Sequence, residues 1–238
     1  MPRLGDLFKA SRYFISHLAR DPFQPGGQRF GYLKGLMTMN YRYASRHPRI
    51  PVRSVVELYP EAEEFIIPME VRKAAWNITP TELYVISAIA LAASPRRIFE
   101  FGTYDGATTL QLARLLPEAE LTTIDFSPNP APGVTVGARF AGQREAERIC
   151  QLFGDTTTFN FSPYRGQFDF VFVDGGHEYP VVKADTQNAL RMVRPGGVIV
   201  WDDYGNWPGV RRAIEELVPA YPVVQLADTK LAYLKVER

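Results

Sequence analysis

Residues 97–106 read Arg-Ile-Phe-Glu-Phe-Gly-Thr-Tyr-Asp-Gly, a short apolar run that leads into a glycine turn. The apolar run predicts a β-strand over 97–101, and a helix is expected from 106 to 116. Glycines at 102 and 106 allow the backbone to turn tightly and to approach a ligand without a Cβ in the way. Because ligands of open α/β sheets bind at such strand-to-helix loops, this stretch indicates both the fold class and a binding site.

The same alternation of apolar strands and helical segments continues from Thr79 to the end of the chain. It is typical of an α/β fold with a mostly parallel, doubly wound, Rossmann-like sheet. Thr79, followed by Pro80 and Glu82, has the pattern of a helix start. We expect strands at 97–101, 121–124, 149–153, 168–173 and 198–201, a turn at 195–197, a closing hairpin of 223–226 and 231–236, and helices at 79–93, 106–116, 179–193 and 208–218.

Residues 1–78 differ from the rest of the chain, since they are rich in Arg, Tyr and Phe and are interrupted by Pro and Gly. Two weakly periodic segments, 4–20 and 28–45, predict amphipathic helices. We therefore expect an N-terminal helical, aromatic extension over 1–78 that acts as a lid or as the interface of a homodimer. A single domain is expected over 79–238. Packing alone would also account for the aromatic residues of the extension.

The composition limits the classes of function. A formal net charge of +1 over 238 residues argues against a protein built mainly to bind nucleic acid. Cys150 is the single cysteine, which excludes an intramolecular disulfide and a cysteine-rich zinc site. The sequence has no apolar run long enough for a membrane-spanning helix and no signal-peptide pattern, so we expect a cytoplasmic protein that does not associate with membranes.

The strand after the first glycine turn ends in an acid, Asp125, which stands 25 residues after Glu100. A carboxylate at this position can accept hydrogen bonds from both hydroxyls of a ribose. The pattern therefore favours a nucleotide-like ligand. A glycine turn that serves chain geometry alone is the alternative.

The type of nucleotide follows from charge and from missing glycines. The dinucleotide fingerprint G-x-G-x-x-G is not present, because Tyr104 and Ala107 stand where its second and third glycines would be. A pyrophosphate would also lie against Asp105 and near Glu100, where like charges repel. S-adenosyl-L-methionine carries a positive sulfonium and no phosphate, so this charge argument favours S-adenosylmethionine as cofactor.

On these residues the chain resembles the class I S-adenosylmethionine-dependent methyltransferases over 79–236. The resemblance implies a seven-stranded sheet with a C-terminal antiparallel hairpin strand. It also implies that Asp125 binds the ribose, that Asp155 contacts the adenine and that the methionine end lies near Thr79. For Asp155, the simple start of a loop is the alternative. The expected cofactor-binding residues are Thr79, Glu100, Gly102, Thr103, Tyr104, Gly106, Asp125, Asp155 and Asp174.

Three further acids follow neighbouring strands. Asp174 comes after the run 168–173, and Asp202 and Asp203 come after 198–201. The ends of adjacent parallel strands meet at one edge of a sheet, where crowded carboxylates repel unless a cation lies between them. Oxygen ligands suit Mg²⁺ or another divalent cation, so these three acids are the expected metal ligands. The alternative is that one or more of them caps a helix or faces solvent.

The acids belong to a pattern, D-G-x-H-x-Y, formed by Asp174, Gly175, His177 and Tyr179. It is similar to that of metal-dependent O-methyltransferases of the catechol and macrocin types. Catechol-type enzymes commonly have an asparagine where Asp203 stands, so the aspartate pair is closer to the macrocin type. The resemblance implies methyl transfer to a hydroxyl of a small molecule, such as a sugar or a natural-product intermediate.

His177 is the candidate general base, with Asp174 as its partner in catalysis, because an imidazole can take a hydroxyl proton near neutral pH. The alternative is that His177 merely caps a helix. Two other functions remain open from sequence: a metal-independent N- or C-methyltransferase, and a non-catalytic nucleotide-binding scaffold.

Overall fold

The computed structural model describes residues 50–70, 77–128 and 133–237. The helices expected at 4–20 and 28–45 lie outside these residues. The expected division of the chain at residues 78 and 79 stays a prediction.

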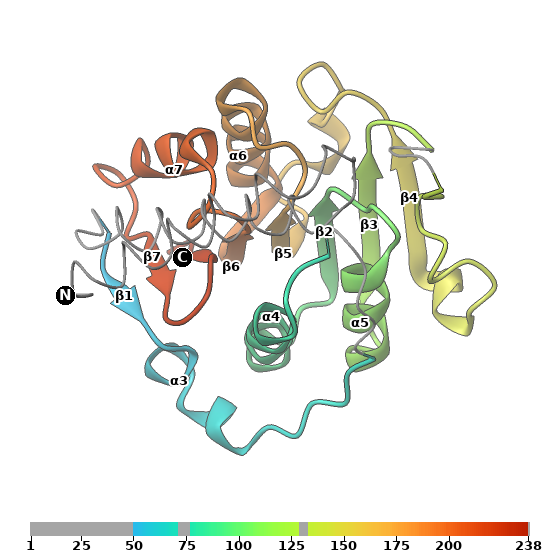
Figure 1. Ribbon diagram of the computed structural model, residues 1–238, viewed down its shortest axis with the longest axis horizontal. Helices are drawn as coiled ribbons and strands as arrows, with labels where there is room; N and C mark the ends of the chain where they lie inside the picture. Colours follow the sequence, from blue (N-terminus) through green and yellow to red (C-terminus); the bar gives the residue numbers. More distant parts are fainter. Residues whose placement is uncertain (1–49, 71–76, 129–132, 238) are drawn as a thin grey trace, which may run out of the picture. The chain divides into compact units, whose positions relative to one another are not determined.

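An eight-stranded sheet forms the centre of the described part of the chain (Figure 1). Its order is β1-β7-β8-β6-β5-β2-β3-β4, and every neighbouring pair is parallel except the two pairs that contain β8. The α/β fold class and all seven expected strands are therefore confirmed, including the antiparallel hairpin of β7 and β8. The strands are β1 (Val52–Arg53), β2 (Arg97–Phe101), β3 (Glu120–Asp125), β4 (Ile149–Phe153), β5 (Phe168–Val173), β6 (Val193–Trp201), β7 (Val224–Leu226) and β8 (Ala232–Lys235).

Strand β1 was not expected from the sequence. It pairs in parallel with β7 through the Gln225 N–H, which donates to the Pro51 carbonyl at 2.8 Å, and the Ala227 N–H, which donates to Arg53 at 2.9 Å. Both of its residues are exposed, so no apolar alternation marks it. The helix α3 (Val55–Leu58) and the 3₁₀ helix η1 (Pro60–Glu64) follow, and Tyr59 between them belongs to the core.

Helices cover both faces of the sheet, as the fully apolar strand β5 requires. Figure 1 shows α4 (Pro80–Ala93) and α5 (Ala107–Leu115) on one face, and α6 (Tyr179–Met192) and α7 (Pro208–Glu215) on the other. Phe170 and Phe172 pack in the cluster of α4 and α5, whereas Val171 packs in the cluster of α6 and α7. Among the described residues, no helix is long and apolar enough to span a bilayer.

The turn expected at 195–197 is part of a longer strand. β6 begins at Val193, and its register with β5 shifts between the pairs Phe168–Val193 and Phe170–Val198. Gly196 has φ +83°, a conformation that glycine adopts without strain. The glycines therefore form an irregularity within β6 rather than a turn before it.

Candidate active site

The loops after β2 and β5 are in direct contact at the carboxyl edge of the sheet. The Asp174 N–H donates to the Phe101 carbonyl at 2.8 Å, and the Gly102 N–H donates to the Ile124 carbonyl at 2.8 Å. Gly102 has φ +89°, and a Cβ on it would lie 2.0 Å from the Asp174 carbonyl oxygen. Position 102 therefore requires glycine, both for its backbone conformation and for the close approach of the two loops.

The Asp125 carboxylate accepts backbone hydrogen bonds from the first glycine loop. Its Oδ2 accepts hydrogen bonds from the N–H groups of Thr103 (3.1 Å) and Tyr104 (2.8 Å), and its Oδ1 accepts one from Phe126 (2.8 Å). The carboxylate oxygens have further lone pairs, so these bonds leave capacity for a ribose hydroxyl. Its predicted role in ribose binding stays a prediction.

The two acids in the charge argument for a sulfonium do not present free negative charge. Glu100 is buried, where its carboxyl contacts the hydroxyls of Thr109 and Thr123, and burial raises its pKa to about 8. Asp105 forms an ion pair with Arg139, with Nε at 2.6 Å from Oδ2. At neutral pH the protonated form of Glu100 is favoured, and Asp105 is paired with Arg139. Neither acid therefore supplies the free negative charge that the sequence predicted.

Three other expected cofactor residues make contacts within their own loops and helix ends. Thr79 is the N-cap of α4, and Gly106 is the N-cap of α5 with φ +84°. Asp155 is exposed, and its Oδ1 accepts hydrogen bonds from the N–H (2.9 Å) and hydroxyl (2.6 Å) of Thr157, which lower its pKa. These contacts organise the loop after β4, in keeping with the simpler reading of Asp155. Contacts of these residues with a cofactor stay predictions.

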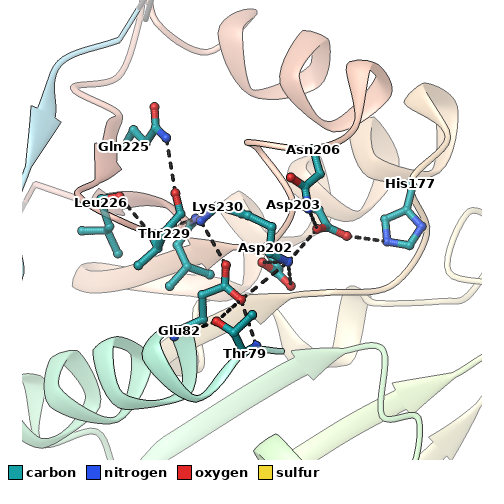
Figure 2. A network of polar contacts seen from close by, with 11 residues as sticks. Thr79, Glu82, His177, Asp202, Asp203, Asn206, Gln225, Leu226, Thr229 and Lys230 are labelled. Carbon is teal, nitrogen blue, oxygen red and sulfur yellow. Dashed lines mark hydrogen bonds and ion pairs between the residues drawn. The ribbon is translucent and has the colours of Figure 1, made fainter. Parts of the chain in front are cut away.

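His177, Asp203 and Asp174 come together at the tips of β5 and β6. One ligand atom from each lies within 4.8 Å of the others. The His177 Nε2 lies 2.8 Å from the Asp203 Oδ2, and the imidazole stacks on Trp207 with 4.7 Å between ring centroids (Figure 2 shows the His177–Asp203 contact). Gly209 permits this arrangement, because a Cβ there would lie 2.4 Å from the His177 carbonyl oxygen.

Lys230 joins this cluster and was not identified from the sequence. Its Nζ lies 2.8 Å from Asp203 Oδ1, 3.3 Å from both oxygens of Asp202 and 3.6 Å from Oε2 of Glu82 (Figure 2). Asp202 is thus engaged by an ammonium, whereas Asp203 contacts both this ammonium and His177. A lysine in a predicted hairpin turn normally faces solvent, so no sequence signal marked Lys230 as part of the site.

The three carboxyl groups differ in charge state. Burial, followed by the charges of Asp202 and Asp203, raises the pKa of Asp174 well above its usual range. Burial and the charge of Asp203 also raise the pKa of Asp202, to about 7. Burial alone would raise the pKa of Asp203, but the hydrogen bond from His177 and the charge of Lys230 outweigh it and hold the pKa at about 2. Burial and crowding therefore favour the protonated forms of Asp174 and Asp202, whereas His177 and Lys230 favour the carboxylate form of Asp203.

The sequence of the chain is similar to those of known methyltransferases. Residues 99–204 match a family model described as a methyltransferase domain. The catechol O-methyltransferase of Mycobacterium tuberculosis is 34% identical over 116 residues, which cover 48% of this chain and 51% of that protein. Catechol O-methyltransferase B of Danio rerio is 24% identical over 135 residues, which cover 56% of this chain and 51% of that protein. The chain thus spans about half the length of these curated relatives.

Solved structures agree with the fold. The O-methyltransferase TomG from Streptomyces achromogenes, involved in tomaymycin synthesis and solved in complex with S-adenosylmethionine, superimposes with a TM-score of 0.56 at 24% identity. The match covers 85% of this chain and 98% of that one. At this identity the likeness establishes the shared fold.

Proposed function

We propose that the chain is an S-adenosylmethionine-dependent O-methyltransferase that acts on a hydroxylated small molecule, because residues 99–204 match a methyltransferase-domain model and the chain shares the fold of TomG. The acceptor class we favour is a sugar or a natural-product intermediate. The homodimer and the cytoplasmic location expected from the sequence stay predictions.

The observation that carries the proposal is the contact between the two loops. The glycine loop of Gly102 adjoins the backbone of Asp174, and His177 follows in the same loop after β5. A cofactor at the glycine loop would therefore lie beside the group that receives the acceptor's proton. Alignment of donor and acceptor contributes about 7–11 kcal/mol in well-oriented reactions, more than base catalysis does.

His177 and Asp203 have the arrangement of a base and the carboxylate that orients it. A hydrogen bond from Nε2–H to Asp203 would leave Nδ1 with the lone pair, and the ionised Asp203 would stabilise the imidazolium that forms. In the proposed step, the acceptor oxygen forms a bond to the methyl carbon while the carbon–sulfur bond breaks. His177 would accept the hydroxyl proton, and S-adenosylmethionine, when bound, would supply the methyl group and leave as a neutral thioether.

The donor atoms at this edge also fit a divalent cation. One ligand atom from each of Asp174, Asp203 and His177 lies within 4.8 Å of the others, and the two carboxylates are ligands that suit Mg²⁺ or Mn²⁺, which leaves His177 as the base. When bound, the cation would supply Lewis-acid activation of the acceptor hydroxyl. Asp174 would bind it as a carboxylate, and Asp202 as a third carboxylate ligand stays a prediction.

Metal-independent methyl transfer is the second candidate. The observation that favours it is Lys230, whose ammonium already lies within 3.3 Å of Asp202 and 2.8 Å of Asp203. An enzyme that carries this positive charge has less need of a metal to offset the two carboxylates.

Calorimetric titration with S-adenosylmethionine, in Mg²⁺ and in EDTA, tests the proposal together with a transfer assay. The assay would present catechol, a hydroxylated sugar and an amine of similar size, and would detect the methylated product by mass. We expect cofactor binding in both buffers and methylation of a hydroxylated compound. If the cofactor does not bind, the methyltransferase proposal fails. Transfer that is insensitive to EDTA would remove only the cation.

A further inference from the structure

Lys230 places a positive charge beside Asp202 and Asp203 at the carboxyl edge of the sheet. We infer that the Lys230 ammonium neutralises Asp202 and one oxygen of Asp203, and thereby competes with a divalent cation for this part of the site. The inference rests on the proposed function, since it concerns the same carboxylates. It assigns to Lys230 the control of metal affinity, a role distinct from chemistry on the substrate.

The loop between β7 and β8 holds Lys230 firmly in this position. Its backbone N–H donates to Oε1 of Glu82 at 3.1 Å. The Thr229 hydroxyl donates to the Leu226 carbonyl at 2.9 Å and accepts from the Leu231 N–H at 3.0 Å, which closes the turn (Figure 2 shows the bond to Leu226). The backbone of Lys230 is therefore fixed, and only its side chain has to be ordered for the ammonium to contact the acids.

The partners of Lys230 are too buried for an ordinary surface ion pair. The side chains of Glu82 and Asp202 are 3% and 4% exposed, and that of Lys230 is 20% exposed. Removal of the ammonium would leave buried carboxylates without a counter-charge, which is strongly unfavourable. The free energy that a divalent cation gains from these carboxylates is correspondingly reduced while Lys230 is present.

The two oxygens of Asp203 divide the edge into two parts. Oδ1 contacts Lys230 at 2.8 Å, and Oδ2 contacts His177 at 2.8 Å. On the His177 side lies Asp174, so a divalent cation has donors there and meets the ammonium on the other side. Two positive centres that share Asp203 repel each other through a short distance in a poorly solvated site.

The test compares Mn²⁺ binding by the full-length chain, followed by electron paramagnetic resonance of the free ion, in wild type and Lys230→Met. We expect Lys230→Met to bind Mn²⁺ about ten-fold more tightly or better, which corresponds to about 1.4 kcal/mol. Lys230→Arg keeps the charge, and Lys235→Met removes one charge from an exposed position on β8. Both controls should bind Mn²⁺ as wild type does. Equal or weaker binding by Lys230→Met would overturn the inference.

Thermal unfolding gives an independent readout. Without metal, Lys230→Met should unfold at a lower temperature than wild type, and Mn²⁺ should raise its midpoint more than that of wild type. If Lys230→Met does not fold, the double variant Glu82→Gln with Lys230→Met removes one charge of each sign and keeps all three acids of the predicted metal site. It should still bind Mn²⁺ about ten-fold more tightly than wild type, and binding equal to wild type contradicts the inference.

Binding of S-adenosylmethionine, measured on the same proteins, separates the two ideas. The cofactor should bind all variants, because Lys230 does not belong to the glycine loop. Loss of cofactor binding in wild type would refute the proposed function, while the Mn²⁺ comparison would still decide the role of Lys230.

Discussion

Asp203 is the residue on which the chemistry of the site converges. Its backbone has φ +60°, a conformation that is uncommon for residues other than glycine. Its carbonyl accepts hydrogen bonds from the N–H groups of Asn206 (2.9 Å) and Trp207 (3.1 Å), which stabilise this conformation. The two consecutive aspartates share Lys230, and Asp203 also contacts His177.

Replacement of His177 tests its assignment as the general base. His177→Gln should lower the single-turnover rate by about 10²–10⁴-fold and leave S-adenosylmethionine affinity unchanged, because the amide cannot accept the proton. Rapid-quench measurement of the methylated product gives the rate. Trp207→Phe retains an aromatic ring beside position 177 and is the matched control, with a much smaller loss. A His177→Gln rate close to wild type would exclude the imidazole as base.

Glu100 should make folding stability depend on pH. Its pKa rises from 4.5 to about 8 on folding because the carboxyl is buried, so the folded state binds the proton more tightly. Its contribution to stability is complete below about pH 4.5 and is lost as the pH rises through about 8. Within this window the slope approaches roughly 1.4 kcal/mol for each pH unit.

Urea unfolding of wild type and Glu100→Gln across this pH range measures the effect. The amide does not titrate, so the difference in free energy of unfolding between the two proteins should change with pH in favour of the variant. Thr108→Val, at a buried position of α5 next to the Thr109 that contacts Glu100, is a control that removes no acid. Parallel curves for wild type and Glu100→Gln would contradict the assigned pKa.

At the scale of elements, two helices begin with the same capping box in different surroundings. Ser54 and Glu57 cap α3 at an exposed position, whereas Thr79 and Glu82 cap α4, where Glu82 also contacts Lys230. The second cap therefore orders a helix and also positions an acid of the Lys230 cluster. The contact between Glu82 and Lys230 joins the start of α4 to the loop between β7 and β8 (Figure 2).

Removal of each cap should separate these roles. Thr79→Ala should lower the free energy of unfolding by about 1–2 kcal/mol, and Ser54→Ala by about 0.5–1 kcal/mol, because the Thr79 cap is partly buried and the Ser54 cap is exposed. Chemical denaturation of both variants provides the values, and Thr79→Ser should retain most of the stability. A larger loss for Ser54→Ala would show that the environment of α4 adds nothing.

For the whole molecule, residues 50–65 are part of the same folded unit as the sheet. Tyr59 lies before α4 in the chain, yet its hydroxyl is 2.9 Å from that of Tyr233 on β8, and the two rings meet edge to face. Both side chains are buried. The segment should therefore unfold together with the sheet rather than before it.

A double-mutant cycle measures this coupling. Tyr59→Phe and Tyr233→Phe should each lower the free energy of unfolding by about 1–2 kcal/mol, since each leaves one buried hydroxyl without its partner. The double variant should lose less than the sum of the two. Thermal unfolding should remain a single transition. Additive losses, or a separate early transition in the wild-type protein, would show that residues 50–65 are independent of the sheet.

The order of the main strands and helices could be read from local patterns. Seven strands and the helices α4 to α7 are marked by apolar runs, caps and glycine turns that lie within a few residues of each other. The acids at the ends of β3, β5 and β6 follow from the same reading, because parallel strands end at one edge. These features depend on neighbours in the chain, and sequence alone therefore determined them.

Contacts between distant residues decided the rest. Lys230 meets Glu82 across 148 positions, Arg139 neutralises Asp105 across 34, and β1 finds β7 without any apolar pattern of its own. The raised pKa of Glu100 and the opposite pKa shifts of Asp202 and Asp203 likewise depend on burial and on contacts with distant residues. The charge of a carboxyl group is a property of its folded surroundings, so only the tertiary structure could assign it.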